Sequence, residues 1–238
     1  MEFHPDKCQV LKITNKAKPI KSNYSIHSKV LKETKEAKYL GVIIDSKLQW
    51  KEQNRYVCKK ANSTLGFLKR NTSACPKYIK EKCYKTLVKP ILDYGCAVWD
   101  PHHKNQMEKI EKVQKNAARY VTNDYTFTSG KTKEHFEQLQ WVPHQETRAK
   151  AKVTTLFKSL HNKIEIPTEQ YKVRSPRMRT RQSGYHTFDI PTSNVDSHLY
   201  SFFPNTIRMW NTLPDRIKIL DNTEYFKTEL QSINIRTG

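Results

Sequence analysis

The sequence has few glycines and lacks the acidic pairs that nucleotide polymerases use. Its 238 residues include six glycines, which leaves little room for a glycine-rich loop that cradles phosphates. It contains no two adjacent aspartates, whereas polymerases hold two divalent metal ions with neighbouring carboxylates. No nucleophile stands near a base at a recognised spacing. We therefore predict no catalytic residue in this chain.

Patterns of metal ligands are also missing. No Cys-x-x-Cys occurs, the nine histidines are scattered, and the adjacent His102 and His103 do not share one helix face. Five cysteines form an odd set without paired spacing, which favours reduced thiols in a cytosolic or nuclear protein. We predict no metal site and no cofactor bound by this chain.

Long apolar runs are absent from the sequence. No segment approaches the roughly 18 apolar residues of a membrane span, and the first residues lack the apolar core of a signal peptide. We therefore expect an intracellular protein, nuclear or cytoplasmic and not secreted. Its partners are expected to include neither a membrane nor a small-molecule substrate.

Positive charge is what the sequence has in excess. Lys and Arg number 43 against 23 Asp and Glu, a net charge of +20. Such a charge favours association with a polyanion such as nucleic acid, with solubility alone as the alternative. The densest group has no acidic residue within it: Lys172, Arg174, Arg177, Arg179 and Arg181. These cations repel one another unless an anion is near, so we predict a flexible nucleic-acid-binding arm ordered by its partner.

The first part of the chain has strand patterns. Short strands are predicted over residues 8–14, 24–27 and 29–31, the last two as a hairpin. Residues 39–44 form an apolar run typical of a strand buried on both faces, interrupted by Gly41. Together they predict a small antiparallel sheet, followed by a helix that begins near Leu48.

From that point the apolar residues recur at helical spacing. Helices are predicted over residues 48–70, from Pro76 to a kink at Pro90, and over 107–121, 133–139 and 145–161. A last compact group covers 202–230, with Trp210 and Phe226 as core residues. The fold class is therefore α+β, mostly α, with a small antiparallel sheet followed by a helical bundle and an irregular helical C-terminal region.

Several ordered blocks carry a family resemblance. The first is Tyr39-Leu40-Gly41-Val42-x-Ile44-Asp45-x-x-Leu48-x-Trp50, and later ones are Tyr84-Lys85-Thr86-Leu87-Val88-Lys89-Pro90, Ala97-Val98-Trp99-Asp100-Pro101 and Tyr200-Ser201-Phe202-Phe203-Pro204. In order and spacing they resemble reverse transcriptases of jockey-like non-LTR retrotransposons, downstream of the polymerase active site. The resemblance covers almost the whole chain.

This resemblance implies a division of the chain into five parts. They are a palm-end β segment (1–49), a thumb-like helical bundle (50–125), a helical region (126–163), the basic flexible arm (164–203) and a C-terminal helical segment (204–238). In the family the thumb helices lie across the RNA/DNA template-primer, which implies phosphate contacts by Lys59, Lys60, Lys69 and Arg70. A merely solvated helix face is the alternative for these four residues.

The resemblance also implies what this chain does not contain. The family's Tyr-x-Asp-Asp hairpin, and the Mg²⁺ ions that it binds, would precede residue 1, so we interpret the chain as a truncated RNA-directed DNA polymerase. The upstream palm and fingers are the implied protein partner. Where the family commonly has His-Ile, this chain has Gln53-Asn54, which we interpret as surface drift rather than a change of function.

Two other interpretations remain open. The chain is alternatively a helical interaction or structural protein, or a non-functional remnant, whose basic surface has no dedicated ligand. A nuclease of the PD-(D/E)xK type would instead require Asp6, Glu36 and Lys38 to converge. The four tryptophans, Trp50, Trp99, Trp141 and Trp210, are interpreted as core residues rather than base-stacking residues.

Overall fold

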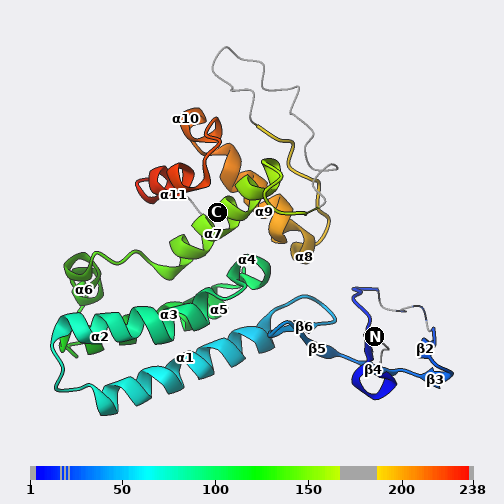
Figure 1. The fold of residues 1–238 in the computed structure, drawn as a ribbon, viewed down its shortest axis with the longest axis horizontal. Coiled ribbons are helices and arrows are strands. Elements are labelled where there is room, and N and C mark those ends of the chain that lie inside the picture. Colours follow the sequence, from blue (N-terminus) through cyan, green and yellow to red (C-terminus); the bar gives the residue numbers. More distant parts are fainter. Residues whose placement is uncertain (1–3, 17, 19, 21, 167–186, 236–238) are drawn as a thin grey trace.

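The computed structural model describes residues 4–16, 18, 20, 22–166 and 187–235. Helices dominate these residues, and short strands precede the first long helix (Figure 1), which confirms the predicted α+β, mostly α class. The strands are β1 (Gln9–Leu11), β2 (Ser25–Ile26), β3 (Lys29–Val30), β4 (Lys32–Thr34), β5 (Glu36–Tyr39) and β6 (Val42–Asp45). The long helices are α1 (Lys51–Asn71), α5 (Lys104–Thr122) and α7 (His144–Leu160). The shorter ones are α2 (Lys77–Cys83), α3 (Lys89–Asp93), α4 (Cys96–Trp99), α6 (Lys131–Leu139), α8 (Asp196–Leu199), α9 (Phe202–Asn211), α10 (Asp215–Lys218) and α11 (Thr223–Gln231).

The strands form three two-stranded pairs. β2 and β3 make the predicted antiparallel hairpin, and β5 pairs antiparallel with β6. β1 runs parallel to β4, with Val10 opposite Glu33. Among the described residues these pairs do not merge into one sheet, so the strand region is smaller and less regular than the sequence suggested.

The apolar run over residues 39–44 is a hairpin, not the single buried strand that its composition predicts. Tyr39 pairs with Val42, which leaves Leu40 and Gly41 as a two-residue turn with φ angles of 45° and 82°. Two successive positive φ angles are the signature of the turn that joins tightly twisted strands. The Tyr94 hydroxyl donates to the Leu40 carbonyl at 2.7 Å and fixes the turn against the helices.

The junction into α1 is organised by Asp45. Its carboxylate accepts hydrogen bonds from the backbone N–H groups of Lys47, Gln49 and Trp50, at 2.9 to 3.1 Å. An aspartate that accepts bonds from the backbone two to five residues later is typical of a turn. These bonds hold the chain in a loop, so α1 begins at Lys51 rather than near Leu48.

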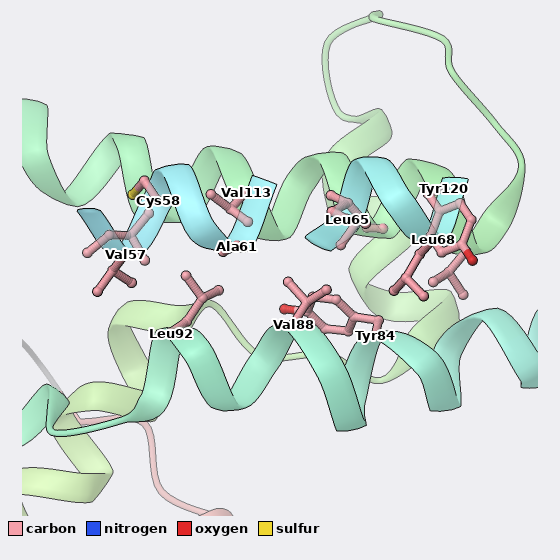
Figure 2. Close-up of a cluster of buried hydrophobic side chains, with 14 of the residues drawn as sticks. Val57, Cys58, Ala61, Leu65, Leu68, Tyr84, Val88, Leu92, Val113 and Tyr120 are labelled. Atoms are coloured by element: carbon pink, nitrogen blue, oxygen red, sulfur yellow. The ribbon is translucent and has the colours of Figure 1, made fainter. Parts of the chain in front are cut away.

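The first hydrophobic core lies among α1, the α2–α3 segment, α4 and α5. Figure 2 shows side chains of α1, such as Ala61 and Leu65, facing Val88 and Leu92 across the interface, with Val113 of α5 beside them. Trp99 is fully buried here, and Trp50 and Trp141 are half-buried against the same cluster. These positions support the interpretation of the tryptophans as packing residues.

The second predicted helix is interrupted before its proline. A π-helical turn over Tyr84–Val88 separates α2 from α3, in which Pro90 is the second residue. Proline has no N–H and its ring clashes with the carbonyl four residues earlier. The wider π turn accommodates this conflict, and the kink at Pro90 stays a prediction.

Helix α7 joins the first core to a second one. Its Val153, Leu156 and Phe157 pack with α9, α10 and α11, where Trp210 and Phe226 are buried as predicted. The Phe157 and Phe226 rings stack with centroids 4.0 Å apart. The opposite side of α7 contacts α4 and α5 (Figure 1), so one helix holds the two clusters together.

Gln53 and Asn54 are buried hydrogen-bonding residues, and their interpretation as surface drift is wrong. Both residues are only 1% exposed. Gln53 Oε1 accepts from the Ile43 N–H at 2.9 Å, and Asn54 Nδ2 donates to the Gln106 carbonyl at 3.0 Å. The two amides therefore tie α1 to the β5–β6 hairpin on one side and to α5 on the other.

Replacing Gln53 by alanine is expected to lower the free energy of unfolding by about 1–3 kcal/mol, because the Ile43 N–H loses its acceptor in a region with little water. Urea denaturation followed by circular dichroism measures the change. Gln138→Ala is the matched control, since Gln138 is an exposed residue of α6 and should change stability by no more than about 0.5 kcal/mol. Equal effects of the two substitutions would contradict a stabilising role of the hydrogen bond between Gln53 and Ile43.

Candidate nucleic-acid interface

Helices α1 and α5 lie side by side and run in the same direction. Near their first turns Asn54 bonds to Gln106, and near their last turns the hydroxyls of Thr72 and Tyr120 are hydrogen-bonded. Figure 2 shows the two helices adjacent above the α2–α3 segment. Two parallel helices packed in this way leave a groove along their shared outer edge.

That groove, called here the α1–α5 groove, has a volume of about 300 Å³. Its lining consists of basic, amide and thiol side chains: Lys51, Asn54, Arg55, Cys58, Asn62, Gln106, Lys109, Lys112 and Asn116. None of the described residues that line it is acidic. The groove therefore presents four cations and several amide groups to whatever enters it.

The floor of the groove is uncharged. Burial raises the pKa of the Cys58 thiol to about 11, although Lys109 and Arg148 act in the opposite direction. The thiol is therefore neutral near pH 7 and lies 3.6 Å from Asn54 Oδ1. A neutral floor beneath cationic walls suits a ligand whose charge is carried on its outside, such as a phosphate backbone.

The cations of the groove are positioned by helical spacing. Lys51 and Arg55 are one turn apart on α1, and Lys109 and Lys112 are three residues apart on α5, so each pair projects on one side of its helix. Arg55 forms an ion pair with Glu52, yet 78% of its side chain is exposed. An exposed pair of this kind is weak, and Arg55 can exchange it for a phosphate.

The residues assigned to phosphate contact from the sequence do not gather at one place. Lys59 and Arg70 are exposed on α1. Lys60 lines a different hollow, beside the β5–β6 hairpin, with Tyr56 and Tyr94. Their role in binding stays a prediction.

Lys69, the fourth of these residues, is half-buried on α1, about two turns beyond Asn62, the last residue of α1 that lines the groove. Its Nζ is 5.7 Å from the centre of the Tyr125 ring. Burial lowers the pKa of Lys69, and the nearby Arg119 lowers it further. A cation of α5 therefore lies close to a cation of α1 here, as it does in the groove itself.

The five cations of the basic arm predicted from the sequence lie outside the described residues: Lys172, Arg174, Arg177, Arg179 and Arg181. Within the predicted arm, Phe188 does fall in the described part, where it exchanges two hydrogen bonds with the Asn211 side chain at 2.8 and 3.1 Å.

Lys51, Arg55, Lys109 and Lys112 were not assigned to a site from the sequence. The available signal was their spacing relative to the apolar stripe of each helix, which places them beside that stripe rather than opposite it. What the sequence does not give is the pairing of α1 with α5, and only this pairing turns two separate helix flanks into one groove.

The residues of the nuclease hypothesis have separate partners. Asp6 forms an ion pair with Lys29, and Lys38 Nζ lies 4.7 Å from the centre of the Tyr56 ring. Over the described part of the chain, no three or more His, Cys, Asp or Glu side chains group together as metal ligands. Within the same residues, no helix has the length and apolarity needed to cross a membrane.

Comparison with known proteins gives one informative similarity. Over 170 residues, 70% of its length, the chain is 22% identical to a protein of Drosophila melanogaster described as a probable RNA-directed DNA polymerase from transposon BS. The chain spans 18% of the length of that relative. No family model and no solved structure matches this chain. The similarity confirms that the chain resembles part of a transposon reverse transcriptase.

Proposed function

We propose that this chain is a nucleic-acid-binding region of a reverse transcriptase and that the α1–α5 groove holds a sugar-phosphate backbone. The observation that carries the proposal is the lining of the groove, with Lys51 and Arg55 on one wall and Lys109 and Lys112 on the other. Similarity to a probable RNA-directed DNA polymerase, a description that involves both RNA and DNA, supports a nucleic acid as the anion.

The geometry suits contact with several consecutive phosphates. From Lys51 to Lys69, α1 rises by about 27 Å, which matches roughly eight phosphates of one strand at 3.4 Å each. Ammonium and guanidinium groups bind phosphate oxygens without reading base edges. We therefore propose a sequence-tolerant contact with an RNA/DNA or DNA duplex.

We further propose that this region adds no metal ligand of its own to polymerisation. The Mg²⁺-binding carboxylates of a complete enzyme, together with its palm and fingers, would come from other segments. The described residues then serve to position a template-primer, which requires charge and shape rather than a reacting group.

The test is fluorescence-anisotropy binding of the chain to a labelled 20-base-pair RNA/DNA hybrid between 50 and 300 mM salt. A variant with Lys51, Arg55, Lys109 and Lys112 replaced by glutamine should bind roughly 100-fold more weakly at low salt. Because each lost phosphate contact removes about 0.9 from the slope of log K against log salt, the slope should fall by about 3 to 4.

A control variant separates the groove from net charge. It replaces four cations that pair with carboxylates elsewhere, Lys29, Lys133, Arg216 and Lys227, by glutamine. Equal losses in the two variants would refute a dedicated groove and favour a helical interaction protein without a nucleic-acid ligand. Alanine variants of Lys59, Lys60, Lys69 and Arg70, and of Arg174, Arg177, Arg179 and Arg181, show whether the residues predicted from the sequence add to the groove.

A further inference from the structure

The loop between α5 and α6 carries two exposed aromatic rings. Helix α5 ends at Thr122, Asn123 follows with a φ of 57°, and α6 begins at Lys131. Within the loop, Tyr125 is 49% exposed and Phe127 is 79% exposed. A single exposed ring is ordinary on a protein surface, but here two exposed rings lie two residues apart in one loop.

The loop is held in place by the carboxylate of Asp124. Its Oδ1 accepts from the backbone N–H and the hydroxyl of Thr126, at 3.0 and 2.7 Å. Its Oδ2 lies 3.1 Å from His135 Nε2 and 3.5 Å from Lys131 Nζ, both on α6. The hydrogen bonds from Thr126, followed by the one from His135, lower the pKa of Asp124. The two rings on either side of Thr126 are therefore displayed by an ordered loop.

Each ring has a cation beside it. The Arg119 guanidinium carbon lies 4.2 Å from the centre of the Phe127 ring, and Lys69 Nζ lies 5.7 Å from the centre of the Tyr125 ring. At this distance the Arg119 guanidinium covers one face of the Phe127 ring. Because Phe127 is largely exposed, the rest of the ring stays open to solvent. Aromatic faces next to cations are the combination with which proteins bind unpaired nucleotides, because bases stack on the rings while phosphates meet the charges.

The loop is continuous with the α1–α5 groove. Arg119 Nη1 donates to Asn116 Oδ1 at 3.2 Å, and Asn116 itself lines the groove. Lys69 and Arg119 thus extend the two cationic walls toward the loop. A strand that follows the groove along α1 and α5 meets the two rings as it leaves.

We propose that Tyr125 and Phe127 form a stacking platform for unpaired bases at the end of the α1–α5 groove, with Lys69 and Arg119 facing the phosphates of those nucleotides. The ligand is the single-stranded extension of a nucleic-acid duplex. This inference rests on the proposed function, since it places the duplex in the groove.

The test compares two probes on the same protein: a blunt 14-base-pair hairpin closed by a non-nucleotide linker, which has no unpaired bases, and the same hairpin with a six-nucleotide single-stranded tail. The full chain should bind the tailed hairpin at least tenfold more tightly, since each stacked base adds roughly that factor. In the double variant Tyr125→Ala, Phe127→Ala this preference should disappear, while binding of the blunt hairpin changes less than twofold. A control variant with two exposed tyrosines of other helices replaced, Tyr78→Ala, Tyr225→Ala, should keep the preference.

A second readout detects stacking directly. The base analogue 2-aminopurine in the tail should lose fluorescence on binding to the wild-type chain and keep it on binding to the double variant. Equal binding of tailed and blunt hairpins by the wild-type chain, or an unchanged preference in the double variant, would overturn the platform alone. If the blunt hairpin binds without dependence on the four groove cations, the proposed function fails as well.

Discussion

Replacing Asp100 by alanine is expected to lower the free energy of unfolding by about 3–5 kcal/mol at pH 7. This carboxylate holds two buried cations of α7. Arg148 Nε donates to Asp100 Oδ1 at 2.6 Å, and Lys152 Nζ is paired with Asp100 Oδ2. Arg148 is 0% exposed and Lys152 is 1% exposed. The alanine variant leaves both charges without that carboxylate in a region that water barely reaches.

The size of the effect follows from desolvation. Moving a charge out of water costs several kcal/mol, and a buried ion pair offsets this cost only while both partners are present. Glu111 Oε1 lies 3.5 Å from Arg148 Nη1, so arginine keeps a second, longer contact with a carboxylate. Lys152 has no comparable alternative among the described contacts, so most of the loss should come from the lysine.

A double variant tests this explanation. Adding Lys152→Met to Asp100→Ala removes the unpaired lysine charge and should recover most of the lost stability. Urea denaturation of the two single variants and the double variant measures the coupling. Asp221→Ala is the control, because the Asp221 side chain is 95% exposed and should change stability by no more than about 0.5 kcal/mol. Additive effects of the two substitutions would contradict the buried pair.

The helical part of the fold could be predicted from the sequence because its apolar residues recur at helical spacing. Helix α5 is the clearest case, with Ile110, Val113, Ala117 and Val121 all buried as a helical stripe requires. Pro76 marks the start of α2 in the same way. These signals are local, so they need no knowledge of which element packs against which.

The predictions that were wrong depend on contacts between distant segments. The apolar run over residues 39–44 predicts one strand, and nothing in its composition marks Leu40 for the positive φ that the β5–β6 hairpin requires. The polarity of the pair Gln53-Asn54 predicts exposure, because its hydrogen-bond partners, Ile43 and Gln106, cannot be identified without the fold. A buried amide is distinguishable from a surface one only once its partners are known.

The candidate site was partly accessible from the sequence. The excess of positive charge indicated a polyanion, and the thumb-like segment indicated α1 as part of the binding surface. The cations that share a groove, such as Arg55 and Lys109, are 54 residues apart along the chain. Periodicity describes each helix separately, so the choice among the many lysines of α1 and α5 required their packing.

Lowering the pH from 7 to 4.5 is expected to destabilise the protein by about 2–3 kcal/mol through His144 alone. The residue is fully buried at the first turn of α7. Burial, with a further contribution from Arg148, lowers the pKa of His144 to about 4, although Asp93 acts in the opposite direction. The ring is therefore neutral in the folded protein at pH 7.

The direction follows from proton binding in the two states. An unfolded histidine has a pKa near 6.5, so between about pH 6.5 and pH 4 the unfolded chain binds a proton that the folded chain rejects. The contribution of neutral His144 to the free energy of unfolding is therefore fully present above about pH 6.5 and is lost as the pH falls through this window. The charged groups that act on the ring are Arg148 on α7 and Asp93 and Lys89 on α3. Glu111 on α5 instead accepts a hydrogen bond from the His144 backbone N–H. His144 Nδ1 is 3.6 Å from Asp93 Oδ1, a separation longer than a hydrogen bond.

Urea denaturation of the wild-type chain and of His144→Gln, at intervals from pH 7.5 to pH 4.5, measures the effect. The variant cannot titrate at this position, so its stability should decline by about 2–3 kcal/mol less than that of the wild type over the window. His103→Gln serves as the control, because His103 is exposed and its replacement should leave the wild-type decline in place. A decline in His144→Gln as steep as in the wild type would assign the acid sensitivity to the carboxylates instead.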